Sequence, residues 1–113
     1  RQRVQLLLNL PLAKLDKAAL MEKGAKVYAM NCAACHGAEG KGTPPMFPAI
    51  AGGKVSAGPI NAHITQVLKG KGTMPPFAQL SDEDIAAVVT YERNALGNSK
   101  GDLAQPADVK ALR

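Results

Sequence analysis

The sequence has few large aromatic side chains: its 113 residues include two Tyr, two Phe and no Trp. A chain of this length is expected to form one domain. A small domain with so few bulky residues must fill its centre with aliphatic side chains or with a bound cofactor. Composition alone leaves both possibilities open.

A long apolar run is also missing. The longest apolar stretch, from Val4 to Leu12, is interrupted by polar residues and by Pro11, and it is too short to span a membrane. Basic residues precede it, as in a signal peptide, but no small-residue cleavage site follows. Because the sequence starts at Arg1 rather than Met, our hypothesis is that it is a fragment or a mature form of a longer protein.

The basic residues do not form runs, although the net charge is +5. They are scattered along the chain without neighbouring aromatics, which argues against nucleic-acid binding. Residues 82–113 carry four Lys or Arg against six Asp or Glu, so the basic excess lies earlier in the chain. This distribution favours a basic face that attracts an acidic protein partner.

The sequence shows no strand pattern and no internal repeat, and it predicts an all-α fold. Ser81 is a typical N-cap, followed by three acidic residues in the first helical turn, and Gly97 is a typical helix stop. Helices are predicted over 14–31, 59–68 and 82–95, with a short helical turn that Pro106 begins.

Two segments rich in Gly and Pro separate these helices, at 37–58 and 71–80. Such composition predicts loops. A long loop without secondary structure is uncommon in a small domain unless it surrounds something. The loops are therefore a second indication of a cofactor.

The chemistry centres on Cys32-Ala33-Ala34-Cys35-His36. Two thiols at this spacing can add to the vinyl groups of a haem, and the adjacent imidazole can bind its iron from the same side. A disulfide, a thioredoxin-like redox pair and a zinc site are the alternatives. The redox pair would need an α/β pattern, and zinc would need four ligands where only His63 remains as a further strong one.

A haem iron that one His binds needs a sixth ligand for electron transfer, and the thioether sulfur of Met is the usual choice. Met21 and Met30 precede the motif on the same predicted helix and cannot easily reach the opposite haem face. Met74 lies in a Pro-flanked loop that has room to cross to that face, so it is the favoured ligand. Met46, in the long loop, is the second choice.

The other ring nitrogen of His36 must be held by an acceptor, and a carbonyl of the long loop can do this. Pro48 is the predicted acceptor, with Pro44 and Pro45 behind it. His63 is expected at the surface of its helix. The lysines that flank the loops are expected to be solvated, and some can form a docking ring; they are Lys41, Lys54, Lys69 and Lys71.

Together these residues resemble class I cytochromes c. The matching motifs are Gly24-x-x-x-Tyr28, Cys32-Ala33-Ala34-Cys35-His36, Pro48-Ala49-Ile50-x-Gly52, Met74 in its loop, and Tyr91 on the last long helix. The resemblance implies three to five helices around one covalent haem c, with the N- and C-terminal helices crossing. It implies that Gly24, Tyr28 and Tyr91 meet there. It also implies that His36 and Met74 are the axial pair.

Longer stretches are similar to the cytochrome c domain at the C-terminus of subunit II of bacterial caa3-type haem-copper oxidases. They are residues 31–36, 44–49, 63–70, Phe77, 80–98 and 105–113. The likeness covers 21–113, which we interpret as the cytochrome c domain, and leaves 1–20 as a linker or N-terminal extension. Leu96 departs from the pattern, because that group often has Trp there.

This resemblance implies a relay rather than an enzyme in its own right. Electrons would come from a donor cytochrome or a quinol-oxidising complex and pass to the copper centre of the preceding domain. The site would lie on the periplasmic side of the bacterial cytoplasmic membrane, attached to it only through the parent complex. The alternatives are a free periplasmic monohaem cytochrome c, the haem domain of a dehydrogenase, and an open-iron catalyst or gas sensor.

Overall fold

The computed structural model describes residues 14–43, 47–72 and 74–113. No strand occurs in these ranges, so the all-α prediction is confirmed; two isolated bridges, Thr43 with Phe47 and Lys71 with Met74, close turns in the loops. The helices are α2 (Lys17–Asn31), α3 (Ala33–His36), α4 (Ile60–Lys69), α5 (Asp82–Asn94) and α6 (Pro106–Leu112).

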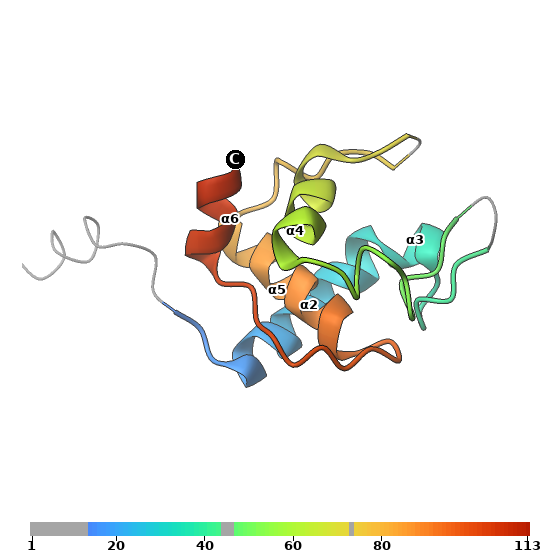
Figure 1. Ribbon diagram of the computed structural model, residues 1–113, viewed down its shortest axis with the longest axis horizontal. Helices are drawn as coiled ribbons and strands as arrows, with labels where there is room; N and C mark the ends of the chain where they lie inside the picture. The colour runs from blue at the N-terminus through green and yellow to red at the C-terminus, as the bar shows by residue number, and fades with distance from the viewer. Residues whose placement is uncertain (1–13, 44–46, 73) are drawn as a thin grey trace, which may run out of the picture.

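Helices α2 and α5 cross at the centre of the domain (Figure 1). Gly24 lies at the crossing, where an added β-carbon would overlap the Ala87 carbonyl oxygen. The rings of Tyr28 and Tyr91 pack beside it, with centroids 5.7 Å apart. The expected meeting of Gly24, Tyr28 and Tyr91 is therefore confirmed, and the missing side chain is what permits the close approach.

Local capping decides where the long helices begin. The Asp16 side chain accepts a hydrogen bond from the Ala19 N–H at 2.8 Å, so α2 starts three residues later than predicted. The Ser81 hydroxyl accepts from the Asp84 N–H at 3.0 Å, and α5 begins as predicted. It ends one residue early, at Asn94.

The other predicted helices form with small shifts. Helix α4 begins and ends one residue later than predicted, because Pro59 occupies the N-cap and Gly70 the C-cap. Helix α6 packs against α5 and α4, and its Val109 is fully buried. The Gln105 side chain pairs with both backbone groups of Leu15, at 2.8 and 3.0 Å. This link joins the start of α6 to the segment before α2.

The sequence analysis placed the end of a linker or N-terminal extension at residue 20. In the structure, residue 20 lies inside helix α2, which begins at Lys17. Leu20 is fully buried in the core, so the chain after Asp16 packs as part of the domain. Residues 1–13, including the stretch from Val4 to Leu12, lie outside the described residues. Within the described part, no helix is both long enough and apolar enough to cross a membrane.

Candidate functional site

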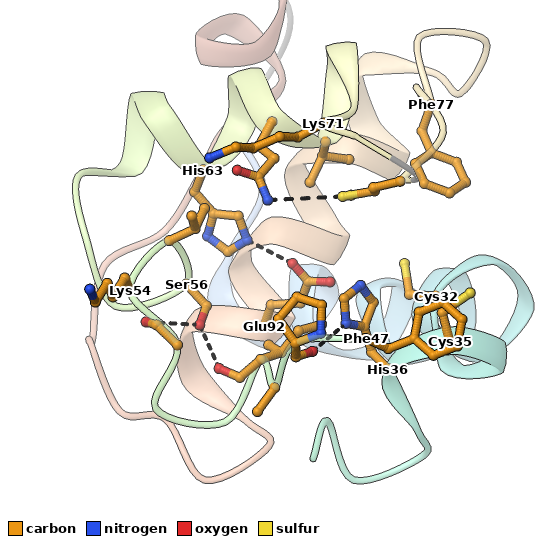
Figure 2. A pocket seen from close by; sticks show the side chains of 18 of the residues that line it. Cys32, Cys35, His36, Phe47, Lys54, Ser56, His63, Lys71, Phe77 and Glu92 are labelled. Carbon is orange, nitrogen blue, oxygen red and sulfur yellow. Dashed lines mark hydrogen bonds and ion pairs between the residues drawn. The ribbon is translucent and has the colours of Figure 1, made fainter. Parts of the chain in front are cut away.

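A cavity of about 610 Å³ opens between the Cys-x-x-Cys-His motif, the long loop and helix α4. Its walls are the end of α2, helix α3, the loop at 47–56, helix α4, the segment at 71–77, and Glu92 of α5. Figure 2 shows Cys32, Cys35, His36 and Phe47 together on one side of this space. Lys71 and Phe77 lie on the opposite side. The size is in the range of cofactor sites.

Helix α3 is a single turn that follows α2 directly and presents the motif to the cavity. The Cys35 and His36 N–H groups donate to the Cys32 carbonyl oxygen, at 3.2 and 3.0 Å. Both thiols are free; Cys32 is buried and Cys35 is exposed. Burial, and secondarily the charge of Glu92, raises the pKa of the Cys32 thiol to about 12. The thiol is therefore protonated at neutral pH.

The imidazole of His36 is oriented by the long loop. Its Nδ1 lies 2.8 Å from the Pro48 carbonyl oxygen. Because a carbonyl can only accept, Nδ1 carries the hydrogen, and Nε2 has a free lone pair for a metal. The Tyr28 hydroxyl donates to the Gly37 carbonyl at 2.6 Å and anchors the turn after the motif.

Gly42 allows this loop to reach His36. It has a φ of +65°, and an added β-carbon would overlap the Phe47 carbonyl oxygen and lie 2.6 Å from the Pro48 carbonyl oxygen. A larger residue would therefore displace the acceptor from the imidazole. The sequence analysis counted Gly42 only as a loop residue, and its role depends on a contact between separate parts of the loop.

Met74 approaches from the segment after α4. Of the three methionines in the described ranges, only Met74 lines the cavity; Met30 is 83% exposed, and Met46 lies outside those ranges, as do Pro44 and Pro45. The Gln66 side-chain nitrogen lies 3.9 Å from the Met74 sulfur. The structure thus brings His36 and Met74 to one cavity.

Gly70 shapes the turn that carries Met74. It has a φ of +74°, and an added β-carbon would overlap the Met74 carbonyl oxygen and lie 2.9 Å from backbone atoms of Pro75 and Pro76. The Phe77 N–H donates to the Val67 carbonyl at 3.0 Å and ties the segment back to α4. The close passage of the backbone past Gly70 and the hydrogen bond to Val67 both hold this segment against the end of α4.

The rival interpretations of the motif find little support. The described residues contain no group of three or more His, Cys, Asp or Glu side chains that could hold a metal ion, which argues against zinc. A thioredoxin-like pair would follow a strand, and none exists in the described ranges. Two free thiols, an available imidazole nitrogen and a thioether around one cavity fit a covalently attached haem.

His63 does not lie at the surface, so that prediction is wrong. It is 3% exposed and lines the cavity, because it shares the inner face of α4 with Val67. Its Nε2 lies 2.7 Å from Glu92 Oε1, and its Nδ1 lies 3.3 Å from Arg93 Nη1. These partners on α5 satisfy the imidazole in the interior.

The sequence analysis did not identify Glu92 and Arg93 as buried residues. Glu92 is 4% exposed and Arg93 is 1% exposed. A signal existed, because Glu92 follows Val88 and Val89 by four and three residues and so continues the apolar stripe of α5. Lys41, Lys54, Lys69 and Lys71 are all exposed, as expected.

Comparison with known proteins gives a consistent result. The sequence model of the family described as "Cytochrome C oxidase, cbb3-type, subunit III" matches residues 19–91. The chain is 33% identical to cytochrome c-552 of Thermus thermophilus, over 68% of this chain and 70% of that protein. It is 36% identical to cytochrome c6 of Picosynechococcus sp. (strain ATCC 27264 / PCC 7002 / PR-6), over 74% of this chain and 80% of that protein.

A larger protein also contains a similar region. The cytochrome c subunit of alcohol dehydrogenase (quinone) from Gluconobacter oxydans (strain 621H) is 32% identical over 89% of this chain. The alignment covers 24% of that subunit, so the chain spans about a quarter of its length.

Proposed function

This chain belongs to the cytochrome c family, whose members carry a covalent c-type haem and transfer electrons, and we propose that it holds one haem in the described cavity. The observation that carries the proposal is the convergence of four groups. The thiols of Cys32 and Cys35 and the free nitrogen of His36 enter from one side, and Met74 lines the same cavity from the segment after α4.

Each residue has a distinct task in this proposal. Cys32 and Cys35 would hold the haem through two thioether bonds, and His36 and Met74 would bind its iron. Pro48 keeps the imidazole in one orientation through its carbonyl oxygen. The haem supplies a one-electron couple between ferric and ferrous iron, and the thioether ligand favours the ferrous state. Two protein ligands leave no open coordination position, which suits a carrier rather than a catalyst.

The visible spectrum of the full chain, produced with a c-haem maturation system, tests this assignment. We expect a low-spin spectrum in both oxidation states, with the weak far-red sulfur-to-iron band in the oxidised protein. A high-spin spectrum that lacks this band and shifts when carbon monoxide or cyanide is added would contradict the role of Met74. The open-iron catalyst or sensor would then be favoured.

We further propose that the acceptor is the dinuclear copper centre of a haem-copper oxidase subunit II. The resemblance of residues 80–98 and 105–113 to the caa3-type domain supports this. The matching family is named after subunit III of a different oxidase, the cbb3 type, and so supports only a link to terminal oxidases in general. Fusion to the copper domain would give the acceptor a high effective concentration. The domain would act on the periplasmic side of the membrane, and a donor cytochrome or quinol-oxidising complex would reduce it.

A dehydrogenase haem domain is the second candidate, because the dehydrogenase subunit aligns with 89% of the chain. Rapid mixing can distinguish the two functions. We expect reduced holoprotein to be oxidised quickly by a separately produced copper domain, and more slowly as ionic strength rises. Slow reaction with the copper domain, combined with fast reduction by a quinone-linked alcohol dehydrogenase, would favour the dehydrogenase role.

A further inference from the structure

A network of four ionisable side chains begins at the cavity wall and extends behind it. Arg93 donates from Nε and Nη2 to the Asp102 carboxylate, at 2.8 and 2.9 Å, and from Nη2 to the Gly58 carbonyl at 2.7 Å. Its Nη1 faces His63, which in turn contacts Glu92. His63 and Glu92 line the cavity itself. None of the roles proposed above uses this network.

The hydrogen bonds define the protonation states of the network. A guanidinium can only donate, so the Nδ1 of His63 accepts from Arg93 Nη1. The hydrogen of a neutral imidazole then resides on Nε2, which donates to Glu92 Oε1 at 2.7 Å. His63 is therefore neutral, and Glu92 accepts as a carboxylate.

The charges of the network do not cancel at the cavity. The positive charge of Arg93 is balanced by the carboxylate of Asp102. The negative charge of Glu92 is not balanced by a cation among the described residues, because the side chain that its carboxylate contacts, His63, is neutral. A buried carboxylate with one neutral partner is held at a cost in free energy. The titratable and charged groups that contact the pair or act on it are Tyr28 of α2, Cys32 at the C-cap of α2, Arg93 of α5 and, through Arg93, Asp102. Cys35 and His36 of α3, Lys54 of the long loop and Lys71 after α4 line the same cavity.

The charge of Glu92 acts across the floor of the cavity. Burial makes the larger contribution to the raised pKa of the Cys32 thiol, and the negative charge of Glu92 raises that pKa further. The pKa of the Tyr28 hydroxyl is raised in the same way, mainly by burial and then by the charge of Glu92. The negative charge of Glu92 therefore acts on Cys32, a residue that would form a thioether bond with the haem. Little solvent screening is expected in such a site.

We propose that the His63–Glu92 pair binds one proton when the haem gains one electron, and releases it when the electron leaves. The inference rests on the proposed position of the haem. The donor protein supplies the electron and water supplies the proton. Glu92 is the acceptor because both ring nitrogens of His63 are already engaged. The proton offsets the added negative charge next to a buried carboxylate.

The test is the midpoint potential of the holoprotein as a function of pH, with the Glu92→Gln variant. We expect the native potential to fall with rising pH over the range in which reduction is accompanied by proton uptake. The slope should approach about 59 mV per pH unit, the one-electron equivalent of a tenfold change. Glu92→Gln should have a higher potential and a flat profile. Glu83→Gln removes a charge from the exposed side of the same helix and should match the native protein.

A flat native profile would overturn the proposal, and so would a Glu92→Gln variant that retains the native slope. If Glu92→Gln does not assemble, His63→Gln serves in its place: it removes the Nε2–H donor to Glu92 but keeps the carboxylate, so a sloping region displaced along the pH axis would support the pair, and an unchanged profile would refute it. A pH-indicator dye in weakly buffered solution should also report proton uptake on reduction. The visible spectrum of the same samples separately reports whether His36 and Met74 bind the iron, so the two proposals can fail independently.

Discussion

A β-carbon added to Gly24 would lie 2.6 Å from the β-carbon of Tyr91, closer than two side chains can approach. Helices α2 and α5 therefore cross with no room for a side chain at this position. The crossing holds Tyr28 of α2 beside α5, and Cys32 caps the C-terminal end of α2, so the crossing also sets the position of the Cys-x-x-Cys-His motif.

We predict that Gly24→Ala destabilises the domain by about 1–3 kcal/mol, because the overlap with the Ala87 backbone outweighs the better helix propensity of Ala. Denaturant unfolding measures the free energy directly. Lys26→Ala, at an exposed position of the same helix, is the control and should change stability little. Equal stability of Gly24→Ala and the native protein would contradict the close packing.

We predict that Cys35→Ser retains haem through a single thioether to Cys32, and that Cys32→Ser does so through Cys35 or loses the haem. Mass spectrometry of the denatured protein reports attachment, and the pyridine haemochrome spectrum reports the number of saturated vinyl groups. A variant lacking both thiols should hold no covalent haem. Complete attachment in both single variants would refute the motif as the attachment site.

We predict that Met74→Ala lowers the midpoint potential and allows exogenous ligands to bind, because the soft sulfur that favours ferrous iron is removed. Carbon monoxide binding to the reduced protein measures the open position. Met30→Ala, at a position 83% exposed on α2, should behave as the native protein. An unchanged spectrum in Met74→Ala would shift the ligand assignment to Met46.

We predict that Gly70→Ala weakens the iron–sulfur bond without removing the sulfur, because the new β-carbon would displace the Met74 backbone. The far-red band should weaken and carbon monoxide should bind in part. Gly72→Ala is a matched control: its φ is also positive, at +59°, but no atom lies within 4 Å of the added carbon. If both variants behave alike, backbone strain rather than the overlap is responsible.

We predict that the folded domain loses stability in acid as the Asp102 carboxylate becomes protonated. The hydrogen bond from Arg93 holds the pKa of this carboxyl below its ordinary value. Its contribution is therefore present above the unfolded-state pKa of about 3.9, and it is lost as pH falls through the lower folded-state pKa.

Asp102→Asn tests this dependence. It should cost about 1–2 kcal/mol near pH 7, since the carboxylate is partly solvated. The difference from the native protein should narrow below about pH 4, where Asp102 is protonated in the unfolded chain. Unfolding measured at both pH values provides the comparison. A difference that does not change with pH would show that the ionised carboxylate is not what stabilises Arg93.

Local features of the site could be predicted because their causes lie within a few residues. The spacing of Cys32, Cys35 and His36 indicates the attachment motif, although helix α3 that carries it was not predicted, and the caps at Ser81 and Pro59 define where helices begin. The choice of Met74 also came from its surroundings, a Pro-flanked loop far along the chain. Its place in the cavity agrees with that choice, while its bond to iron stays a prediction.

The misjudged and missed residues all depend on contacts between distant segments. His63 was expected in water, yet its partner Glu92 is 29 residues away, on a helix whose position against α4 no local pattern specifies. The same holds for Gly42 and Gly70, since a glycine in a loop becomes essential only when another backbone passes within van der Waals contact.

The sequence by itself determined the chemistry: which thiols, which imidazole and which thioether are available, and the helices that carry them. These follow from residue type and spacing, which act over one or two helical turns. The tertiary structure alone decided that a buried carboxylate and a neutral imidazole share the cavity with those ligands. That arrangement arises from the packing of α4 on α5, where burial removes solvent and leaves each charge dependent on its neighbours.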